Sequence, residues 1–190
     1  RFFSTSDSEV ILKAYHAWGP DCVQRFNGMF AFAIRERESG RTVLARDRMG
    51  IKPLYLADTD GGLRFASSLP ALLATGGLDR TIDPVALHHY FSFHSVVPAP
   101  HTLFKGVRKL PPATVLVIEA DGSRKQDTYW QPDYDLRAEE RSLSADDWRE
   151  RVEAALRAAV RRRLVADVPV GVLLFGGLDS SLIVGLLAEA

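Results

Sequence analysis

Short runs of apolar residues, separated by turn-forming residues, fill the stretch from residue 28 to residue 66. Runs of this length with turn signals between them predict β-strands. The predicted strands are 28–35, 41–46, 53–57 and 63–66. Their close spacing predicts an antiparallel meander. Two later strands, 114–119 and 124–130, flank a turn that contains Gly122 and predict a hairpin.

Helical patterns precede, interrupt and follow these strands. Ser6 and the acidic residues Asp7 and Glu9 stand directly before the apolar residues of 10–18, which is typical of a capped helix start. A long helix with one apolar and one charged face is predicted from residue 146 to about residue 164. Shorter helices are predicted over 21–26, 69–75 and from Pro84 onward.

A composition change marks a boundary within the chain. Residues 131–144 lose apolar periodicity and gain charge, which is typical of a linker. We therefore predict one domain over residues 1–130, a linker over 131–145, and a second domain that begins at residue 146.

Residues 170–181 are predicted to form a buried strand, a glycine loop and a helix start, in this order. The apolar run 170–175 has the length of a strand covered on both faces. Gly176 and Gly177 let the backbone pass close to a ligand, and Asp179 and Ser180 favour a helix start. Backbone N–H groups at such a helix start can receive phosphate. The loop matches neither the dinucleotide fingerprint nor the Walker pattern, and its other interpretation is an ordinary tight turn.

The overall composition limits the classes of partner. The 190 residues are 46% hydrophobic, enough for a core, and 24 basic residues balance 24 acidic ones. A net charge of zero gives no electrostatic argument for nucleic acid or an anionic membrane. The single Cys22 excludes an internal disulfide and fits a reducing, cytoplasmic compartment. No apolar run approaches the roughly 18 residues of a membrane span.

Three charged or histidine-rich groups have structural interpretations. Four histidines lie between residues 88 and 101, but their spacing fits no zinc pattern, so we expect no metal site. Arg46, Asp47 and Arg48 are predicted to form an ion-pair network that fixes a turn before Gly50. The basic run 161–163 ends a helix, where cations suit the helix dipole.

Several stretches, taken in order, resemble one family. They are Ser6-Asp-Ser-Glu-Val-Ile-Leu12, Asn27-Gly-Met-Phe-Ala-Phe-Ala33, Arg46-Asp-Arg-Met-Gly-Ile-Lys-Pro-Leu-Tyr55, Val97-Pro-Ala-Pro-His-Thr-Leu-Phe-Lys-Gly106, Lys109-Leu-Pro-Pro112 and Gly176-Gly-Leu-Asp-Ser-Ser181. Each stretch is weakly specific, but the ordered set covers nearly the whole chain. The set resembles the glutamine-dependent asparagine synthetases.

The resemblance implies a mixed fold, α/β together with α+β. Its first part is the αββα sandwich of a class II glutamine amidotransferase, an N-terminal-nucleophile (Ntn) hydrolase fold. Its second part is a synthetase domain with a doubly wound parallel sheet. Residues 1–130 resemble the later part of the first domain. Residues 146–190 resemble the first helix, strand and phosphate loop of the second, so the chain is expected to be truncated at both ends.

The family's chemistry implies a ligase that makes asparagine from aspartate, glutamine and ATP, releasing glutamate, AMP and pyrophosphate. An N-terminal Cys attacks glutamine in this family, and the chain has no such residue. Cys22 lies within a predicted helix and is interpreted as core packing. Asp7 matches the residue that holds the α-amino group of glutamine, although a helix-capping role is its alternative.

The resemblance also implies a nucleotide site in the second domain. Its ATP-binding residues would be Leu173, Gly176, Gly177, Leu178, Asp179 and Ser180. Mg²⁺ would accompany the phosphates near Asp179. The family's first loop serine is replaced by Phe175, which removes one hydroxyl donor to phosphate.

Two alternatives stay open at this point. The acceptor could be another carboxylate, such as a glutamine dipeptide, because the sequence shows no acceptor pocket. The chain alone could also be a non-catalytic fragment or binding module, the full-length parent being the enzyme. The expected partners are glutamine, ATP and the carboxylate acceptor, without nucleic acid or membrane, and the sequence leaves a homodimer open.

Overall fold

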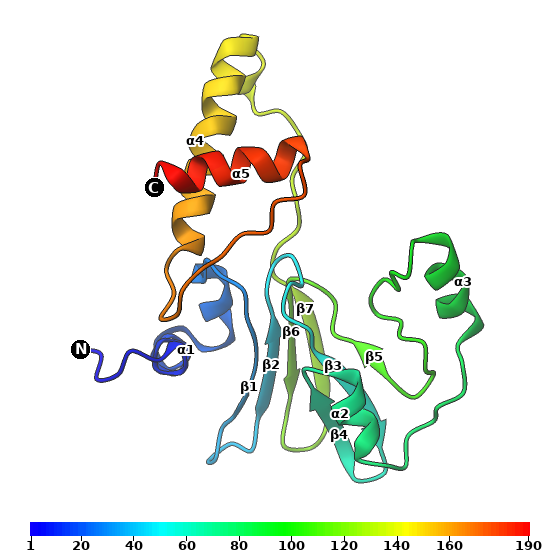
Figure 1. Cartoon of the computed structure of the whole chain (residues 1–190). Coiled ribbons are helices and arrows are strands. Elements are labelled where there is room, and N and C mark those ends of the chain that lie inside the picture. The colour runs from blue at the N-terminus through cyan, green and yellow to red at the C-terminus, as the bar shows by residue number, and fades with distance from the viewer. The chain divides into compact units, whose positions relative to one another are not determined.

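A computed structural model describes residues 1–190, and the chain divides into two compact units (Figure 1). The first unit, Arg1–Pro132, contains every β-strand, and the second, Asp133–Ala190, contains helices and connecting segments. None of the helices is both long enough and apolar enough to cross a lipid bilayer.

The first unit contains two antiparallel sheets. The larger sheet has the order β1-β2-β6-β7, and the smaller sheet has the order β4-β3-β5. The strands are β1 (Ala31–Arg35), β2 (Thr42–Arg46), β3 (Tyr55–Thr59), β4 (Gly62–Ala66), β5 (Arg108–Lys109), β6 (Thr114–Ile118) and β7 (Arg124–Thr128). The predicted hairpin over 114–130 is confirmed as the β6–β7 pair.

The single meander predicted over residues 28–66 is wrong. The pairs β1–β2 and β3–β4 are both formed, but β2 and β3 belong to different sheets. In a meander, β3 would pair with the side of β2 that faces away from β1. In the structure β6 pairs with that side, and Leu44 lies opposite Leu116. A pairing between strands this far apart in sequence leaves no signal in a local hydrophobic pattern.

Four helical segments belong to the first unit. They are α1 (Asp7–Trp18), the 3₁₀ helix η1 (Gly19–Arg25), α2 (Leu69–Ala74) and α3 (Pro84–Ser92). Three of them begin at side-chain caps, because Ser6, Ser68 and Asp83 each accept a hydrogen bond from a backbone N–H of the first turn. These starts agree with the sequence predictions, and the segment predicted over 21–26 is a 3₁₀ helix.

The hydrophobic core forms three layers, because successive residues of a strand point to opposite faces of its sheet. Val43 and Ala45 pack with Ala14 and Cys22, which joins the larger sheet to α1 and η1. Leu44, between them in sequence, packs among five buried leucines between the two sheets: Leu44, Leu54, Leu56, Leu110 and Leu116.

The third core layer lies on the smaller sheet, where Ala57 packs with Leu72 of α2 and with Val107. Figure 1 shows α2 against β3 and β4, and shows α1 next to the larger sheet. The order helix, sheet, sheet, helix confirms the αββα sandwich. Cys22 is fully buried and unpaired in the first layer, which confirms its core-packing role.

The second unit consists of η2 (Ala138–Glu140), α4 (Ala145–Arg163) and α5 (Leu178–Ala188). The long helix predicted over 146–164 is confirmed as α4. Its start carries a capping box, in which Ser144 accepts from the N–H of Asp147 and the Asp147 carboxylate accepts from the N–H of Ser144.

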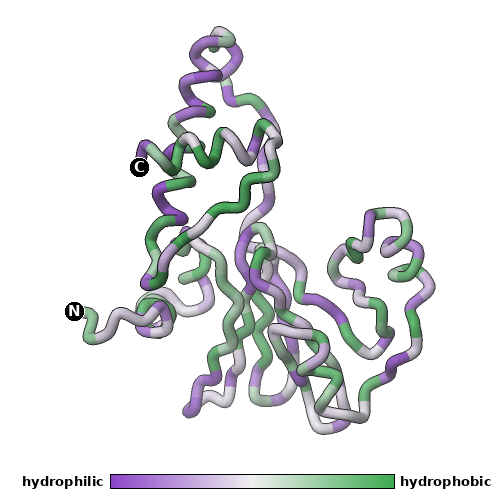
Figure 2. Tube along the Cα trace, viewed as in Figure 1, coloured by the Kyte–Doolittle hydropathy of each residue, from purple (hydrophilic) through white to green (hydrophobic).

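The strand predicted over residues 170–175 is not formed, and this part of the expected parallel sheet is absent. The segment is mostly hydrophobic (Figure 2), yet its side chains are exposed, with Leu173 at 76% and Phe175 at 84%. A strand requires a neighbouring strand to accept its hydrogen bonds. The second unit, Asp133–Ala190, has no other strand, so β-propensity alone does not produce one here.

Candidate functional site

The residues that the sequence predicts for glutamine and for ATP lie in different units. Asp7 is in the first unit, and residues 173–180 are in the second. Each group lies at the start of a helix, where backbone N–H groups lack carbonyl partners within the helix. The two helix starts are built in different ways.

Asp7 is the first residue of α1 and keeps its carboxylate free. The capping function belongs to Ser6, whose Oγ accepts from the N–H of Ser8 at 3.2 Å. Asp7 itself is exposed and forms no hydrogen bond or ion pair with the protein. Its negative charge is favourable at a helix N-terminus. The geometry therefore leaves a carboxylate that can accept a cationic group from a ligand.

Sequence reasoning did not identify Glu9 as part of this site. The Glu9 carboxylate accepts from the backbone N–H groups of Phe3 and Ser4, from the Ser4 hydroxyl, and pairs with Lys13. These donors lower the pKa of Glu9 to about 2, with Lys13 and the Ser4 hydroxyl as the largest causes. The acidic residue two positions after Asp7 and the serine upstream were the signal available in the sequence.

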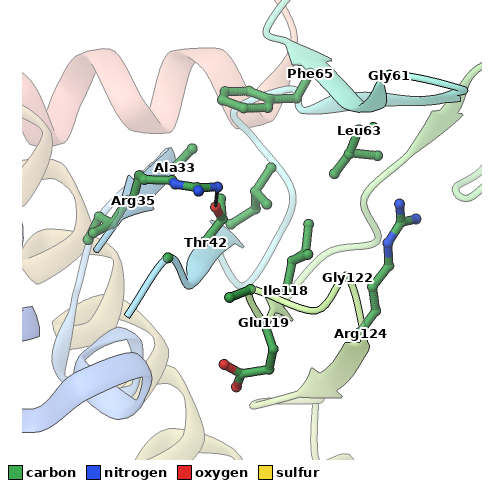
Figure 3. A pocket seen from close by; sticks show the side chains of 15 residues that line it. Ala33, Arg35, Thr42, Gly61, Leu63, Phe65, Ile118, Glu119, Gly122 and Arg124 are labelled. Carbon is green, nitrogen blue, oxygen red and sulfur yellow. Dashed lines mark hydrogen bonds between the residues drawn. The ribbon is translucent and has the colours of Figure 1, made fainter. Parts of the chain in front are cut away.

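A cavity of about 480 Å³ lies between the two sheets but contains none of the predicted site residues. In Figure 3, Leu63 and Phe65 of β4 face Thr42 and Ile118 of the other sheet. The charged groups at its rim are paired within the protein, as shown by Arg35, which donates to Thr42 Oγ1 at 3.2 Å.

Other charged rim residues are paired as well. Arg124 donates to Asp58 at 2.5 Å, and both carboxylate oxygens of Glu119 accept from Arg41, which lies outside the lining, at 3.1 Å. These contacts use the charges that a polar ligand would need, so the cavity is not the best candidate for the chemistry.

The Arg46 guanidinium fixes the turn after β2 by binding backbone carbonyls. It donates to the carbonyl oxygens of Lys52, Leu110 and Gly50 at 2.8, 2.6 and 2.7 Å. Burial lowers the pKa of Arg46. The predicted role in fixing the turn is therefore confirmed for Arg46.

Asp47 completes the same turn and is 1% exposed. Its carboxylate accepts from the backbone N–H groups of Phe30, Met49, Ile51 and Lys52, at 2.9–3.2 Å. No Arg46–Asp47 ion pair is formed, so the predicted ion-pair network is wrong. Both buried side chains instead bind backbone groups, Arg46 the carbonyl oxygens and Asp47 the N–H groups.

Gly50 is required where this turn is tightest. It has a φ of +64°, and an added Cβ would lie 2.9 Å from Pro112 Cγ and 3.2 Å from Arg46 Cζ. The hydrogen-bonded turn leads the chain from β2 in the larger sheet to β3 in the smaller sheet.

The glycine loop of the second unit has the backbone of a helix start. Gly176 has a φ of +73°, and Gly177 is the residue before α5. The N–H and Oγ of Ser181 donate to the Gly177 carbonyl at 3.0 and 2.8 Å, and Ser180 Oγ donates to it at 3.0 Å. The N–H groups of residues 178–180 have no partner in the protein, so they can receive an anion.

The remaining predicted ATP-binding residues surround this loop but are not packed against it. Leu173, Leu178 and Asp179 are exposed, and so is Phe175. A Cβ atom added at Gly176 would meet no atom within 4 Å, and one added at Gly177 would meet only Ser180 Oγ, at 3.9 Å. The helix start of the predicted site is formed, while nucleotide binding stays a prediction.

The histidines near α3 form an aromatic group. His89 stacks on Phe93 with ring centroids 5.4 Å apart and lies 6.0 Å from His101. His101 Nδ1 contacts the carboxylate of Asp83 at 3.2 Å. No group of three or more His, Cys, Asp or Glu side chains in the chain is placed to hold a metal ion.

Two known protein families match parts of the chain. A family of glutamine amidotransferase domains matches residues 1–130, and a family described as asparagine synthase matches residues 151–190. The two matches lie in the same order as the two units.

Two curated relatives match nearly the whole chain. Asparagine synthetase [glutamine-hydrolyzing] 3 of Bacillus subtilis (strain 168) is 35% identical over 188 residues, which is 99% of this chain and 30% of the relative. Putative asparagine synthetase [glutamine-hydrolyzing] 2 of Methanocaldococcus jannaschii is 36% identical over 188 residues, 97% of this chain and 35% of the relative. The chain thus spans about a third of the length of these relatives.

A solved structure shows a weaker likeness. The glutamine phosphoribosylpyrophosphate amidotransferase of B. subtilis, complexed with ADP and GMP, aligns with a TM-score of 0.45 and 14% sequence identity. The alignment covers 100% of this chain and 39% of that structure.

Proposed function

Since the chain belongs to the family of glutamine amidotransferase domains, we propose that it is part of an ATP-dependent ligase that amidates a carboxylate with nitrogen from glutamine. The observation that carries this proposal is the ordered match of two families on one chain. An amidotransferase family alone would supply only ammonia, whereas an asparagine synthase family beside it supplies a use for that ammonia.

Asp7 is proposed to hold the α-ammonium group of glutamine. Its carboxylate is exposed at the start of α1 and has no partner in the protein, since Ser6 supplies the cap. A hydrogen bond between charged groups is about twice as strong as one between neutral groups. Asp7 can therefore orient glutamine by its α-ammonium group and leave the side-chain amide for attack.

Cys22 does not supply the nucleophile for this attack. It is fully buried in the core, and burial raises the pKa of its thiol, which disfavours the reactive thiolate. In the resembling family the nucleophile is an N-terminal Cys that uses its own α-amine as base. We propose that the full-length enzyme carries such a Cys outside residues 1–190.

The glycine loop is proposed to bind the phosphates of ATP. The unpartnered N–H groups of residues 178–180 can donate to the β- and γ-phosphate oxygens, which leave as pyrophosphate. Gly176 and Gly177 give the phosphates close access to the backbone. The backbone around Leu173 would meet the adenine.

Asp179 is proposed to assist Mg²⁺ at this loop. It is exposed in the first turn of α5, and Mg²⁺ is commonly held by one or two carboxylates together with substrate phosphates. The residues present therefore fit a phosphate-bound Mg²⁺, which would neutralise charge on the leaving pyrophosphate.

The proposed reaction has two steps. An oxygen of the acceptor carboxylate attacks the α-phosphorus of ATP, and the bond to pyrophosphate breaks, which leaves an acyl-adenylate. Ammonia then attacks the acyl carbon and loses a proton, and AMP leaves as the amide forms. We propose aspartate as the acceptor because both relatives bear the name asparagine synthetase.

The setting that we propose is a reducing one such as the cytoplasm. The chain has one cysteine, and its thiol is unpaired and buried in the core. A core thiol of this kind is compatible with a compartment that keeps thiols reduced.

The experiment that tests the function uses the purified full-length enzyme with glutamine, aspartate, ATP and Mg²⁺. Amino-acid analysis should show asparagine and glutamate formed in equal amounts. Ammonium chloride in place of glutamine should also support asparagine formation. Absence of asparagine from both nitrogen sources, with a folded enzyme, would contradict the proposal.

A further inference from the structure

The segment before Asp7 is tied to α1 by one carboxylate, that of Glu9. Glu9 accepts from the N–H of Phe3 at 2.8 Å, the N–H of Ser4 at 2.6 Å and the Ser4 hydroxyl at 2.7 Å. It also pairs with Lys13 at 2.7 Å, one helical turn further along. An ionised carboxylate offers about four acceptor positions, and here four donor groups use them.

Hydrogen bonds of two serines connect this carboxylate to the backbone around Asp7. Ser4 Oγ accepts from the N–H of Ser6 at 3.2 Å, and Ser6 Oγ accepts from the N–H of Ser8 at 3.2 Å. The backbone on both sides of Asp7 is therefore held by side chains of the same segment. Asp7 is the acidic residue of this turn whose carboxylate has no partner.

The two carboxylates of the first turn thus differ in availability. The acceptor positions of Glu9 are filled by protein donors, so it has no room for a ligand's ammonium group. The same donors lower the pKa of Glu9 to about 2, so its charge and its contacts persist at neutral pH. A cation that reaches this helix start meets Asp7.

We propose that Glu9 is a positioning residue for glutamine: it fixes residues 3–6 and thereby holds Asp7 where its carboxylate meets the α-ammonium group. The inference rests on the proposed function of Asp7. It assigns Glu9 no contact with the substrate and no part in bond making. Glu9 therefore influences how tightly glutamine is held, and it leaves the chemistry to other groups.

The test compares Glu9→Gln with the wild type in the full-length enzyme, in steady-state assays with glutamine or ammonium chloride as nitrogen source. The amide side chain offers one oxygen in place of two and cannot form an ion pair with Lys13. The KM for glutamine should rise about tenfold, which corresponds to about 1.4 kcal/mol. The kcat with glutamine and the rate with ammonia should change less than about twofold.

Glu38→Gln is the matched control. Glu38 lies exposed after β1, has no partner in the protein, and loses the same charge on substitution. Its KM for glutamine should equal that of the wild type. A tenfold rise in this variant as well would show a long-range charge effect and would overturn the inference.

Ser4→Ala is a second variant, on an exposed residue, that removes one donor to Glu9 and the acceptor for the N–H of Ser6. It should raise the KM for glutamine by about threefold to tenfold, in the range of one ordinary intramolecular hydrogen bond. If Glu9→Gln does not fold, Ser4→Ala decides the question by the same criterion. An unchanged KM in the folded variants would overturn the role of Glu9.

Asp7→Asn separates this inference from the proposed function. If Asp7→Asn raises the KM for glutamine and Glu9→Gln does not, the positioning role is wrong while the function of Asp7 stands. If Asp7→Asn leaves the KM unchanged, the proposed role of Asp7 falls, and the inference for Glu9 falls with it.

Discussion

The helix starts of α1 and α5 differ in how completely their own residues support them. At α1, Ser6 caps the helix, Glu9 ties the preceding segment to the first turn, and Ala14 lies in the core. At α5, the residue before the helix is Gly177, no side chain caps the backbone, and residues 165–179 are exposed.

The two helix starts therefore illustrate two kinds of binding site, one fixed by the protein's own hydrogen bonds and one with free N–H groups. The start of α1 is fixed by short-range hydrogen bonds within residues 3–13, so its geometry comes from the local sequence. The start of α5 leaves N–H groups free and has space beside both glycines, as close approach of a phosphate requires. A ligand is expected to order the second start more than the first.

The largest expected effect comes from Asp47→Ala in the first unit. The substitution leaves four backbone N–H groups around this turn without the buried carboxylate that accepts from them. The free energy of unfolding should fall by about 3–5 kcal/mol. Urea unfolding of the chain, followed by circular dichroism, measures it.

Asp60→Ala is the control for that measurement, because Asp60 is exposed in the β3–β4 turn and has no partner in the protein. Its free energy of unfolding should stay within about 0.5 kcal/mol of wild type. Equal losses in the two variants would contradict the account of the turn.

The next effect concerns nucleotide binding at α5. Phe175 is 84% exposed beside the loop, so Phe175→Ser removes no core packing and offers a hydroxyl to phosphate. A hydrogen bond to a charged group contributes about 1.5–3 kcal/mol, so the affinity of the full-length enzyme for ATP should rise at least about tenfold. Calorimetric titration with ATP measures it.

Asp179→Ala is the counterpart in the same assay system. It should abolish adenylation, measured by pyrophosphate exchange, with serine or phenylalanine at position 175. Equal ATP affinity with and without Phe175 would show that the ring does not influence the loop.

A smaller effect is expected when the contributions of the two helix starts to the free energy of unfolding are compared. Ser6→Ala removes the α1 cap and should lower the free energy of unfolding by about 1 kcal/mol. Gly177→Ala adds a methyl group in open space at a residue with no side-chain cap, so its effect should stay within about 0.5 kcal/mol. Denaturant unfolding of the two variants tests the comparison, and a larger loss in Gly177→Ala would reverse it.

The smallest effect is a local response to acid. Because the pKa of Glu9 is lowered to about 2, its stabilising contacts are complete above the ordinary pKa of a glutamate and are lost as pH falls toward 2. Carbon-13 NMR of the Glu9 carboxyl should show a midpoint near pH 2. A midpoint near the ordinary glutamate value would contradict the four-donor arrangement.

The sequence predicted most individual elements because their signals are local. Ser6 and Pro84 mark helix starts, and the alternating faces of Val43 and Leu44 give β2 two packing surfaces. The hydrophobic pattern alone did not show the division into two sheets, which only the family resemblance implied, because it depends on β6 pairing with β2 and on Asp47 binding distant N–H groups.

The geometry of the candidate sites could not be predicted from local sequence patterns either. The resemblance identified Asp7 and the glycine loop, but the sequence did not show whether Ser6 or Asp7 caps α1. That choice depends on which side-chain oxygen reaches the N–H of Ser8. The apolar run 170–175 predicted a strand, yet a strand also requires a partner, and hydrophobic pattern does not supply one.

The nucleotide products test the central claim most directly, namely that the loop before α5 serves an adenylating ligase fed by glutamine. The full-length enzyme is incubated with glutamine, aspartate, ATP and Mg²⁺, and the nucleotides are separated by chromatography. We expect one AMP and one pyrophosphate for each asparagine formed, because the loop has no Walker lysine and presents the N–H groups of residues 178–180 instead. Stoichiometric formation of ADP and phosphate would contradict the claim.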